Sequence, residues 1–376
     1  MSGTLYPAAR TLSARLAEHF ARHARPSAPS AAAGPRPDAA TIEALVDAAF
    51  WASLQREEGY APEISLAFLP PELAAHPLLF AAPLPLGPRT LARLAPAVER
   101  PGIHLGVWRV GEGLGVWGTT RSLPSFCFVV EVVAPGLLVV KHRIGGESAK
   151  FRNVAVFEGE AVKVLDMQAG DAAEHPPLLR ALLAPEASSS AGDSVDLLLR
   201  LAVSMRAHRR GGTLLVVPAG STAWRASIVE PVTYSVVPAF AELADLVVDS
   251  AADAGAPRHE QVSRAVDAAA GLTAVDGATV MTDRYELLAF GVKIGRPEGR
   301  PRVESVMLSE PIEGGVASRV AAAELGGTRH ISAAQFAQDQ PQAVALVASQ
   351  DGRFTIFAWS PRHSMVHAHR VEALLL

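Results

Sequence analysis

The stretch Val275-Asp276-Gly277-Ala278-Thr279-Val280 is a short apolar run that begins with an aspartate and a glycine. Further along the chain, Gly326-Gly327-Thr328-Arg329-His330-Ile331-Ser332-Ala333-Ala334 offers a glycine pair, a hydroxyl and two basic side chains, where a helix is expected to begin near Ile331. A carboxylate binds a divalent metal or orients a hydroxyl, and the amide groups of a helix N-terminus bind phosphate. Together the two stretches predict a site that handles a nucleoside triphosphate.

The sequence around both stretches alternates between helix and strand patterns. Leu197, Leu201 and Met205 form the apolar stripe of one helix, which ends at Gly211-Gly212. A second helix is expected after Pro257. The remaining elements are expected as strands at residues 213–217, 274–281, 286–294 and 343–348, a helix at 332–338, a turn at 350–353 and a strand at 354–359. This order predicts a mixed β-sheet with helices on its faces.

The N-terminal half has a different pattern. Leu12, Leu16 and Phe20 mark one amphipathic helix, and a second helix is expected over residues 41–58 with Thr41 as its cap. Short apolar or alternating runs follow, separated by Gly, Pro and Ser, at residues 103–110, 115–118, 126–133, 137–142 and 154–157. They predict an α+β domain with a mainly antiparallel sheet.

Two stretches rich in proline, alanine and serine divide the chain, at residues 25–40 and 184–193. We therefore expect an N-terminal helix and linker over residues 1–40, a domain over 41–183, a linker over 184–193 and a second domain over 194–376. The predicted fold class is an α/β (α+β) two-domain protein.

Composition narrows the classes of partner. The 376 residues are 49% apolar, so sizeable cores are expected, and 34 Lys and Arg against 38 Asp and Glu give a formal charge of −4. Binding to nucleic acid needs a clear basic excess, so a nucleic-acid partner is not expected. Neither a membrane span nor a signal peptide is evident. The one cysteine, Cys127, is expected as a buried hydrophobe, and its solitary occurrence favours a reducing, cytoplasmic location.

Each candidate site residue has a structural alternative. Asp276 either bonds the backbone of its own turn or binds a metal and orients a hydroxyl. Thr328 is either a helix cap or, with Arg329 and His330, part of an anion site. Ser349 either caps the hairpin turn or reaches the same phosphates.

Three histidines lie close together near the C-terminus. His367 and His369 share one face of an extended segment, and His363 precedes them. No cysteine stands close to them in the sequence. We therefore favour surface or interface histidines over a zinc site.

The C-terminal half contains, in order, a helix, a Gly-Gly-Thr-Leu-Leu-Val-Val strand, a helix, an Asp-Gly-Ala strand, a Gly-Thr-Arg-His helix and a strand-Ser hairpin. This order resembles the diadenylate cyclase domain of the DisA/CdaA type. The resemblance covers roughly residues 190–370. It implies that two domains meet face to face, each holding one ATP. A Mg²⁺ or Mn²⁺ ion and the motif aspartate then promote attack of each 3′-hydroxyl on the other α-phosphate, which yields cyclic di-AMP and pyrophosphate.

The resemblance also implies roles for particular residues. Asp276 would bind the metal and act in catalysis, with Gly277 and Ala278 against the nucleotide. The residues that would hold the phosphates are Gly327, Thr328, Arg329 and His330, with Ser349 in support. The implied partners are ATP or another nucleotide and a homodimer or higher homo-oligomer.

The chain departs from the family pattern at Ile331, where the family has a second arginine that contacts phosphate. Three hypotheses follow. In the first, the C-terminal domain is a cyclic-dinucleotide synthase; in the second, it is a nucleotide sensor that does not catalyse. In the third, the chain is an interaction protein whose motifs are only turns and caps. Asp276 favours the first hypothesis and Ile331 the second.

The N-terminal half resembles the predicted sensor domains of the DACNV type that precede cyclase-like domains. Two stretches carry this resemblance: Ala49-Phe50-Trp51-Ala52-Ser53-Leu54 and Val116-Trp117-Gly118. It implies that the N-terminal domain regulates the C-terminal one.

Overall fold

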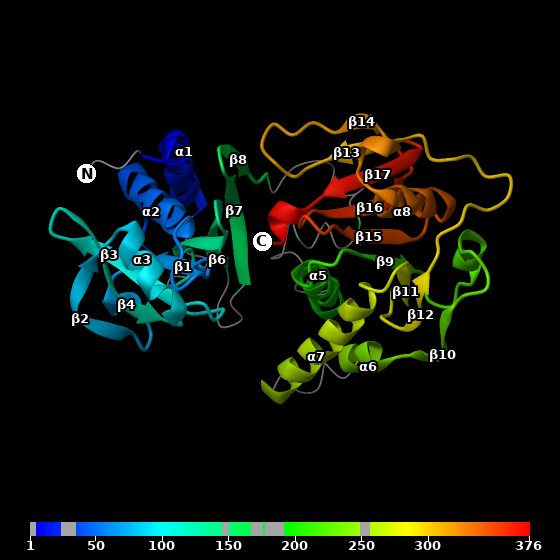
Figure 1. The fold of residues 1–376 in the computed structure, drawn as a ribbon, viewed down its shortest axis with the longest axis horizontal. Coiled ribbons are helices and arrows are strands. Elements are labelled where there is room, and N and C mark those ends of the chain that lie inside the picture. Colours follow the sequence, from blue (N-terminus) through cyan, green and yellow to red (C-terminus); the bar gives the residue numbers. More distant parts are fainter. Residues whose placement is uncertain (1–4, 24–34, 145–149, 167–175, 177–191, 249–255) are drawn as a thin grey trace. The chain divides into compact units, whose positions relative to one another are not determined.

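The computed structural model describes residues 5–23, 35–144, 150–166, 176, 192–248 and 256–376 (Figure 1). The chain forms two compact units that divide between Leu165 and Asp166. The predicted linker at 184–193 lies outside the described residues except for its last two positions, which begin a helix. Among the described helices, none combines the length and apolar character needed to cross a membrane.

The N-terminal unit is built on an eight-stranded sheet in the order β2-β4-β3-β1-β5-β6-β7-β8. β1 and β3 run parallel, and the other neighbouring pairs are antiparallel, as the alternating runs predict. The strands are β1 (Ile64–Phe68), β2 (Leu78–Pro85), β3 (His104–Val110), β4 (Gly113–Thr120), β5 (Phe128–Ala134), β6 (Leu137–Ile144), β7 (Lys150–Glu158) and β8 (Ala161–Val164).

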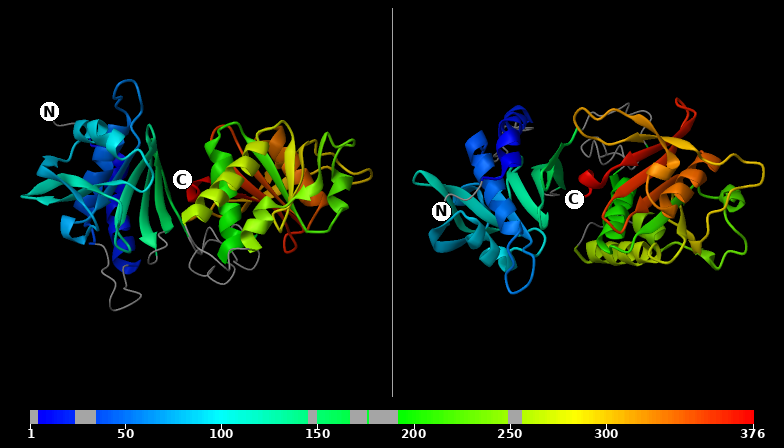
Figure 2. Two further views of the ribbon diagram at one scale, coloured as in Figure 1. Left: turned by 90° about the horizontal axis from the view of Figure 1, so that it is seen from below. Right: turned by 45° about the horizontal axis from the view of Figure 1, so that its top comes forward.

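Helices α1 (Pro7–His23), α2 (Ala39–Ser53) and α3 (Pro88–Leu94) lie on one side of this sheet (Figures 1 and 2). The apolar stripe of α1 and the buried face of α2 join one core with the sheet. The predicted cap of α2 is wrong: the Asp38 carboxylate accepts the Thr41 amide at 2.8 Å, so the helix begins at Ala39. The helix also ends earlier than predicted, at Ser53.

The opposite face of the sheet carries a smaller core and a buried polar pair. Cys127 is fully buried there, and burial raises the pKa of its thiol to about 12, which confirms the prediction of a buried hydrophobe. Ser65 Oγ lies 2.7 Å from His104 Nδ1. Burial lowers the pKa of His104 to about 4, and the nearby Lys141 ammonium adds to this effect.

The C-terminal unit contains a nine-stranded mixed sheet in the order β10-β12-β11-β9-β15-β16-β17-β13-β14. β9 runs parallel to β11, and β13 runs parallel to β17. The strands are β9 (Gly212–Val217), β10 (Tyr234–Phe240), β11 (Ala278–Thr282), β12 (Leu287–Val292), β13 (Ser305–Ser309), β14 (Ser318–Ala321), β15 (Val344–Ala348), β16 (Phe354–Ser360) and β17 (Met365–Arg370).

Helices cover both faces of this sheet, as predicted (Figure 1). α5 (Gly192–Ala207), α6 (Glu242–Val248) and α7 (Ala256–Leu272) lie on one face, and α8 (Thr328–Asp339) lies on the other. The strand β9 has apolar side chains on both faces. Leu214 and Val216 join the core under α5 and α7, whereas Leu215 and Val217 join the core under α8. Since successive side chains of a strand point to opposite faces, a continuous apolar run is buried on both sides.

Candidate functional site

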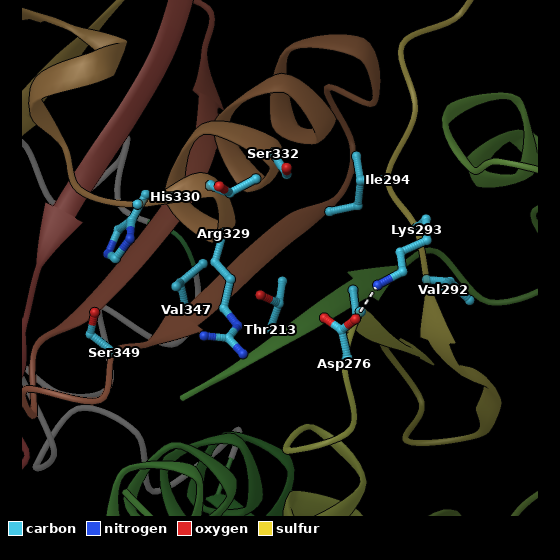
Figure 3. A pocket seen from close by; sticks show the side chains of 14 residues that line it. Thr213, Asp276, Val292, Lys293, Ile294, Arg329, His330, Ser332, Val347 and Ser349 are labelled. Carbon is cyan, nitrogen blue, oxygen red and sulfur yellow. Dashed lines mark hydrogen bonds and ion pairs between the residues drawn. The ribbon is translucent and has the colours of Figure 1, made fainter. Parts of the chain in front are cut away.

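A cavity of about 440 Å³ opens on the α8 face of the C-terminal sheet. It lies at one end of four neighbouring strands, β12, β11, β9 and β15, because the register sets Ala278 opposite Val292 and Thr213 opposite Val347. The N-terminus of α8 lines its other side (Figure 3). The lining residues are Thr213, Asp276, Gly277, Ala278, Val292, Lys293, Ile294, Gly327, Thr328, Arg329, His330, Ser332, Val347 and Ser349.

All eight residues that the sequence marked as candidates line this one cavity. They come from the entry into β11, from the N-cap and first turn of α8 and from the residue that follows β15, which are far apart in the chain. A volume of this size lies within the range of sites that bind nucleotide-sized ligands. The structure therefore brings the candidates together, and their roles toward a ligand remain predictions.

Asp276 stands at the rim of the cavity, directly before β11. Its carboxylate accepts a hydrogen bond from Lys293 Nζ at 2.6 Å, and does not bond the backbone of its own turn. The side chain is 90% exposed. The hydrogen bond and charge of Lys293, with a further contribution from Arg329, hold the pKa of Asp276 below its usual range, so the carboxylate is ionised at neutral pH.

Gly277 allows two strands to approach each other closely. Its φ is +118°, and a Cβ built there would lie 2.5 Å from the carbonyl carbon of Gly291 and 2.7 Å from the Val292 carbonyl oxygen. Both contacts are to the backbone of the neighbouring strand β12 and its flank. The glycine after Asp276 is therefore needed for strand packing, whether or not a ligand also approaches it.

The helix α8 begins at Thr328, three residues earlier than the sequence predicted. Its N-cap is Gly327, which offers no side-chain oxygen, so Thr328 is not the cap. The residues of this first turn line the cavity, and a helix N-terminus without a side-chain cap is a feature that can bind anions. The reason for the early start is that glycine takes the cap position readily, while the bond from the His330 amide to the Gly327 carbonyl (3.0 Å) closes the first turn.

Arg329 and His330 differ in their charge and surroundings. Arg329 is half-buried, reaches from α8 toward Asp276 and Thr213, and joins no ion pair recorded within the described part of the chain (Figure 3). His330 is only 5% exposed and packs edge-on against Phe357. Burial lowers the pKa of His330, so its imidazole is neutral at pH 7 and acts through hydrogen bonds.

Ser349 lies at the other end of the cavity from Lys293 (Figure 3). Its backbone amide donates to the Arg353 carbonyl at 2.8 Å, which starts the predicted hairpin turn, and its side chain faces the cavity. Ile331, by contrast, is not among the residues that line the cavity.

Sequence reasoning missed several lining residues, most importantly Lys293. It is the only lysine after Lys163 in the sequence, a signal that was available. Its backbone is held in place, because the Val229 amide donates to the Lys293 carbonyl at 2.8 Å. The other missed residues are Thr213, Val292, Ile294, Ser332 and Val347, whose side chains face the cavity only because of strand register and helix phase.

The C-terminal histidines lie away from the cavity. The rings of His367 and His369 stack at 3.9 Å in β17, and both contact the hydroxyl of Ser309, at 2.9 and 3.0 Å. His363 packs edge-on against His367. Within the described ranges, no three His, Cys, Asp or Glu side chains are grouped so that they could hold a metal ion.

Comparison with known proteins bears on the N-terminal unit. Residues 31–121 match the family model described as the probable sensor domain DACNV. This match confirms the predicted resemblance over a stretch that runs from α2 to β4 and includes both quoted motifs. The cyclase resemblance of the C-terminal half stays a prediction.

No curated protein matches the chain. Among solved structures, the chain is similar to a protein described as the hypothetical membrane spanning protein from Bacillus cereus, at 13% identity. The match covers 51% of this chain and 71% of that one, with a TM-score of 0.30. A TM-score this low supports no inference from that protein.

Proposed function

We propose that the C-terminal unit is a nucleotidyltransferase that condenses two ATP molecules into cyclic di-AMP or a related cyclic dinucleotide, and that the N-terminal unit regulates it as a sensor. One observation carries this proposal. A single cavity gathers an ionised carboxylate, Asp276, with Arg329 and with a helix N-terminus that lacks a side-chain cap. These are the groups that phosphoryl chemistry requires at one place.

The cavity offers each part of ATP a matching surface. Thr328, Arg329 and the first amides of α8 would bind the phosphates, and neutral His330 and Ser349 would donate further hydrogen bonds. The apolar side chains of Ala278, Val292 and Ile294 would pack against the base and sugar. Asp276 would then orient the 3′-hydroxyl and accept its proton.

A Mg²⁺ or Mn²⁺ ion fits this site only together with a nucleotide. Within the described ranges no group of three metal-binding side chains exists, so a resident metal is not expected to be held by the protein alone. Mg²⁺ in nucleotide sites is commonly held by one or two carboxylates and by the substrate's phosphates, and Asp276 is such a carboxylate. When bound, the ion would neutralise charge on the phosphates.

The reaction needs two copies of the cavity. Each 3′-hydroxyl attacks the α-phosphate of the other ATP, two P–O bonds form, and two pyrophosphates leave. A cavity of about 440 Å³ accommodates one nucleotide, so a second copy of the chain must supply the other. We therefore propose a homodimer or higher homo-oligomer, acting in the cytoplasm.

A second candidate function is a nucleotide sensor that binds without turnover. Two observations favour it. Lys293 Nζ donates a hydrogen bond to Asp276 Oδ2 at 2.6 Å, so the carboxylate already has a partner, and Ile331 stands at the position of the second arginine in the family pattern. In that case the same cavity binds a nucleotide such as ATP, and the signal passes on without chemistry.

Incubation of the purified chain with ATP or GTP and Mn²⁺ or Mg²⁺ separates the candidates, with products read by mass spectrometry. A cyclic dinucleotide made by the wild type and not by Asp276→Asn supports the transferase. Nucleotide binding by calorimetry without product supports the sensor. If neither product nor binding is found, both candidates are wrong.

A further inference from the structure

Within the ranges that the structure describes, Lys293 is the cation that forms an ion pair with the carboxylate of the candidate site. Its ammonium lies 2.6 Å from Asp276 Oδ2, although seventeen positions separate the two residues in the sequence. Strand pairing between β11 and β12 creates this contact, because Ala278 stands opposite Val292.

The backbone that carries Lys293 is fixed on its other side as well. The Val229 amide donates to the Lys293 carbonyl at 2.8 Å, and Ile228 forms an antiparallel bridge with Ile294. The Lys293 ammonium therefore contacts Asp276 from a backbone segment that is hydrogen-bonded to its neighbours. The position of the charge is built into the sheet.

The chemistry of lysine suits a replaceable counter-cation. An ammonium is a compact, strongly hydrated point charge, whereas an arginine would bind a carboxylate with a bidentate fork. Both partners are largely open to water, with side chains 57% and 90% exposed, so the pair is weak and exchangeable. From residue 166 onward, Lys293 is the single lysine in the sequence, and all the remaining Lys or Arg positions are arginine.

The negative charge of Asp276 disfavours the binding of a nucleotide in the cavity. An ionised carboxylate near the phosphates repels them unless a cation lies between. Arg329 lowers the pKa of Asp276 only as a minor contributor, whereas Lys293 contacts the carboxylate directly. Lys293 therefore stands where a nucleotide-bound divalent cation would otherwise neutralise this carboxylate.

We propose that Lys293 is a tethered counter-cation that lets the cavity bind ATP without a divalent cation, and that a divalent cation must compete with it for Asp276. The inference rests on the proposed function, since it concerns how the same cavity accepts its nucleotide. Binding and turnover then have different requirements. Without a ligand, the charge of the Asp276 carboxylate is balanced by the Lys293 ammonium, and only displacement of Lys293 frees the carboxylate to act on a hydroxyl.

ATP affinity measured by calorimetry with EDTA and, separately, with Mg²⁺ tests this inference. We expect the wild-type dissociation constant to change less than about threefold between the two conditions. Lys293→Met should bind ATP about tenfold or more weakly in EDTA and recover most of that loss with Mg²⁺. Arg264→Gln removes the same charge from an exposed ion pair on α7 and should behave as wild type.

The double variant Asp276→Asn with Lys293→Met separates a counter-cation from a direct phosphate ligand. Because both charges are then removed, we expect metal-free binding to return to within about threefold of the wild type. A double variant that stays as weak as Lys293→Met would overturn the inference, as would Lys293→Met binding ATP normally in EDTA. The thermal midpoint of each variant checks that the exposed substitutions leave the fold unchanged.

The same measurements separate failure of the inference from failure of the proposed function. Wild-type protein that binds ATP only with Mg²⁺ contradicts the role of Lys293 and leaves the proposed function standing. Wild-type protein that binds no ATP in either condition contradicts both.

Discussion

Replacement of Gly277 by alanine tests the packing at the base of the candidate site. The new Cβ would lie 2.5 Å from the carbonyl carbon of Gly291 and 2.7 Å from the Val292 carbonyl oxygen, both backbone atoms. Backbone cannot rotate away as a flexible side chain can, so the strand β12 would have to shift. The residue also has φ +118°, which is unfavourable for alanine.

Two costs add in this substitution. Holding a non-glycine residue in a sparsely populated backbone region costs about 1–3 kcal/mol. Forcing an extra methyl group into a packed site costs roughly another 1–3 kcal/mol. We therefore expect Gly277→Ala to lower the free energy of unfolding of the C-terminal unit by about 2–6 kcal/mol, which in a unit of this size lowers the thermal midpoint by roughly 4–24 °C.

A matched glycine in the same unit should respond in the opposite direction. Gly271 lies in α7, and a Cβ there meets no atom within 4 Å. Gly271→Ala is expected to raise stability by about 0.5–1 kcal/mol, because alanine loses less conformational entropy in a helix. Calorimetric scans and urea titrations of both variants measure the contrast. Equal midpoints for Gly277→Ala and the wild type would refute the packing argument and leave ligand approach as the reason for this glycine.

Three further predictions concern single side chains. Arg329→Met should weaken ATP binding about 10- to 100-fold by calorimetry, since a charge-assisted hydrogen bond is lost. The thermal midpoint should change little, because Arg329 joins no ion pair with the residues that the structure describes. His104 has a folded-state pKa of about 4, below its usual 6.5, so the folded unit binds fewer protons than the unfolded chain between these pH values. The contribution of His104 to the free energy of unfolding is therefore complete above about pH 6.5 and falls by up to about 3 kcal/mol toward pH 4. Urea titrations should find this loss reduced in His104→Gln. Cys127, with a pKa of about 12 and full burial, should resist iodoacetamide at pH 8 in native buffer and react completely in urea; modification of the native protein would contradict its placement.

The elements with strong local patterns could be predicted from the sequence. β9 and β15 are continuous apolar runs, and α5 carries an apolar stripe at helical spacing, so their burial and type follow from side-chain chemistry alone. In the C-terminal unit, the strands β10, β13, β14 and β17 were not predicted. They lie at or near the edges of the sheet, where exposed polar and apolar residues mix and where pairing with a neighbour, rather than a periodic pattern, makes the segment a strand.

The sequence by itself determined which chemistry the C-terminal unit offers: a carboxylate before a strand and a glycine pair followed by a hydroxyl and an arginine at a helix start. Those residues are visible in one dimension because glycine and charge interrupt apolar runs. Only the tertiary structure decided that Asp276, Arg329 and Ser349 share one cavity, that His330 is buried and neutral, and that Lys293 neutralises Asp276. The physical reason is that strand order, strand register and the desolvation of a side chain depend on segments far apart in the chain, so no local pattern encodes them.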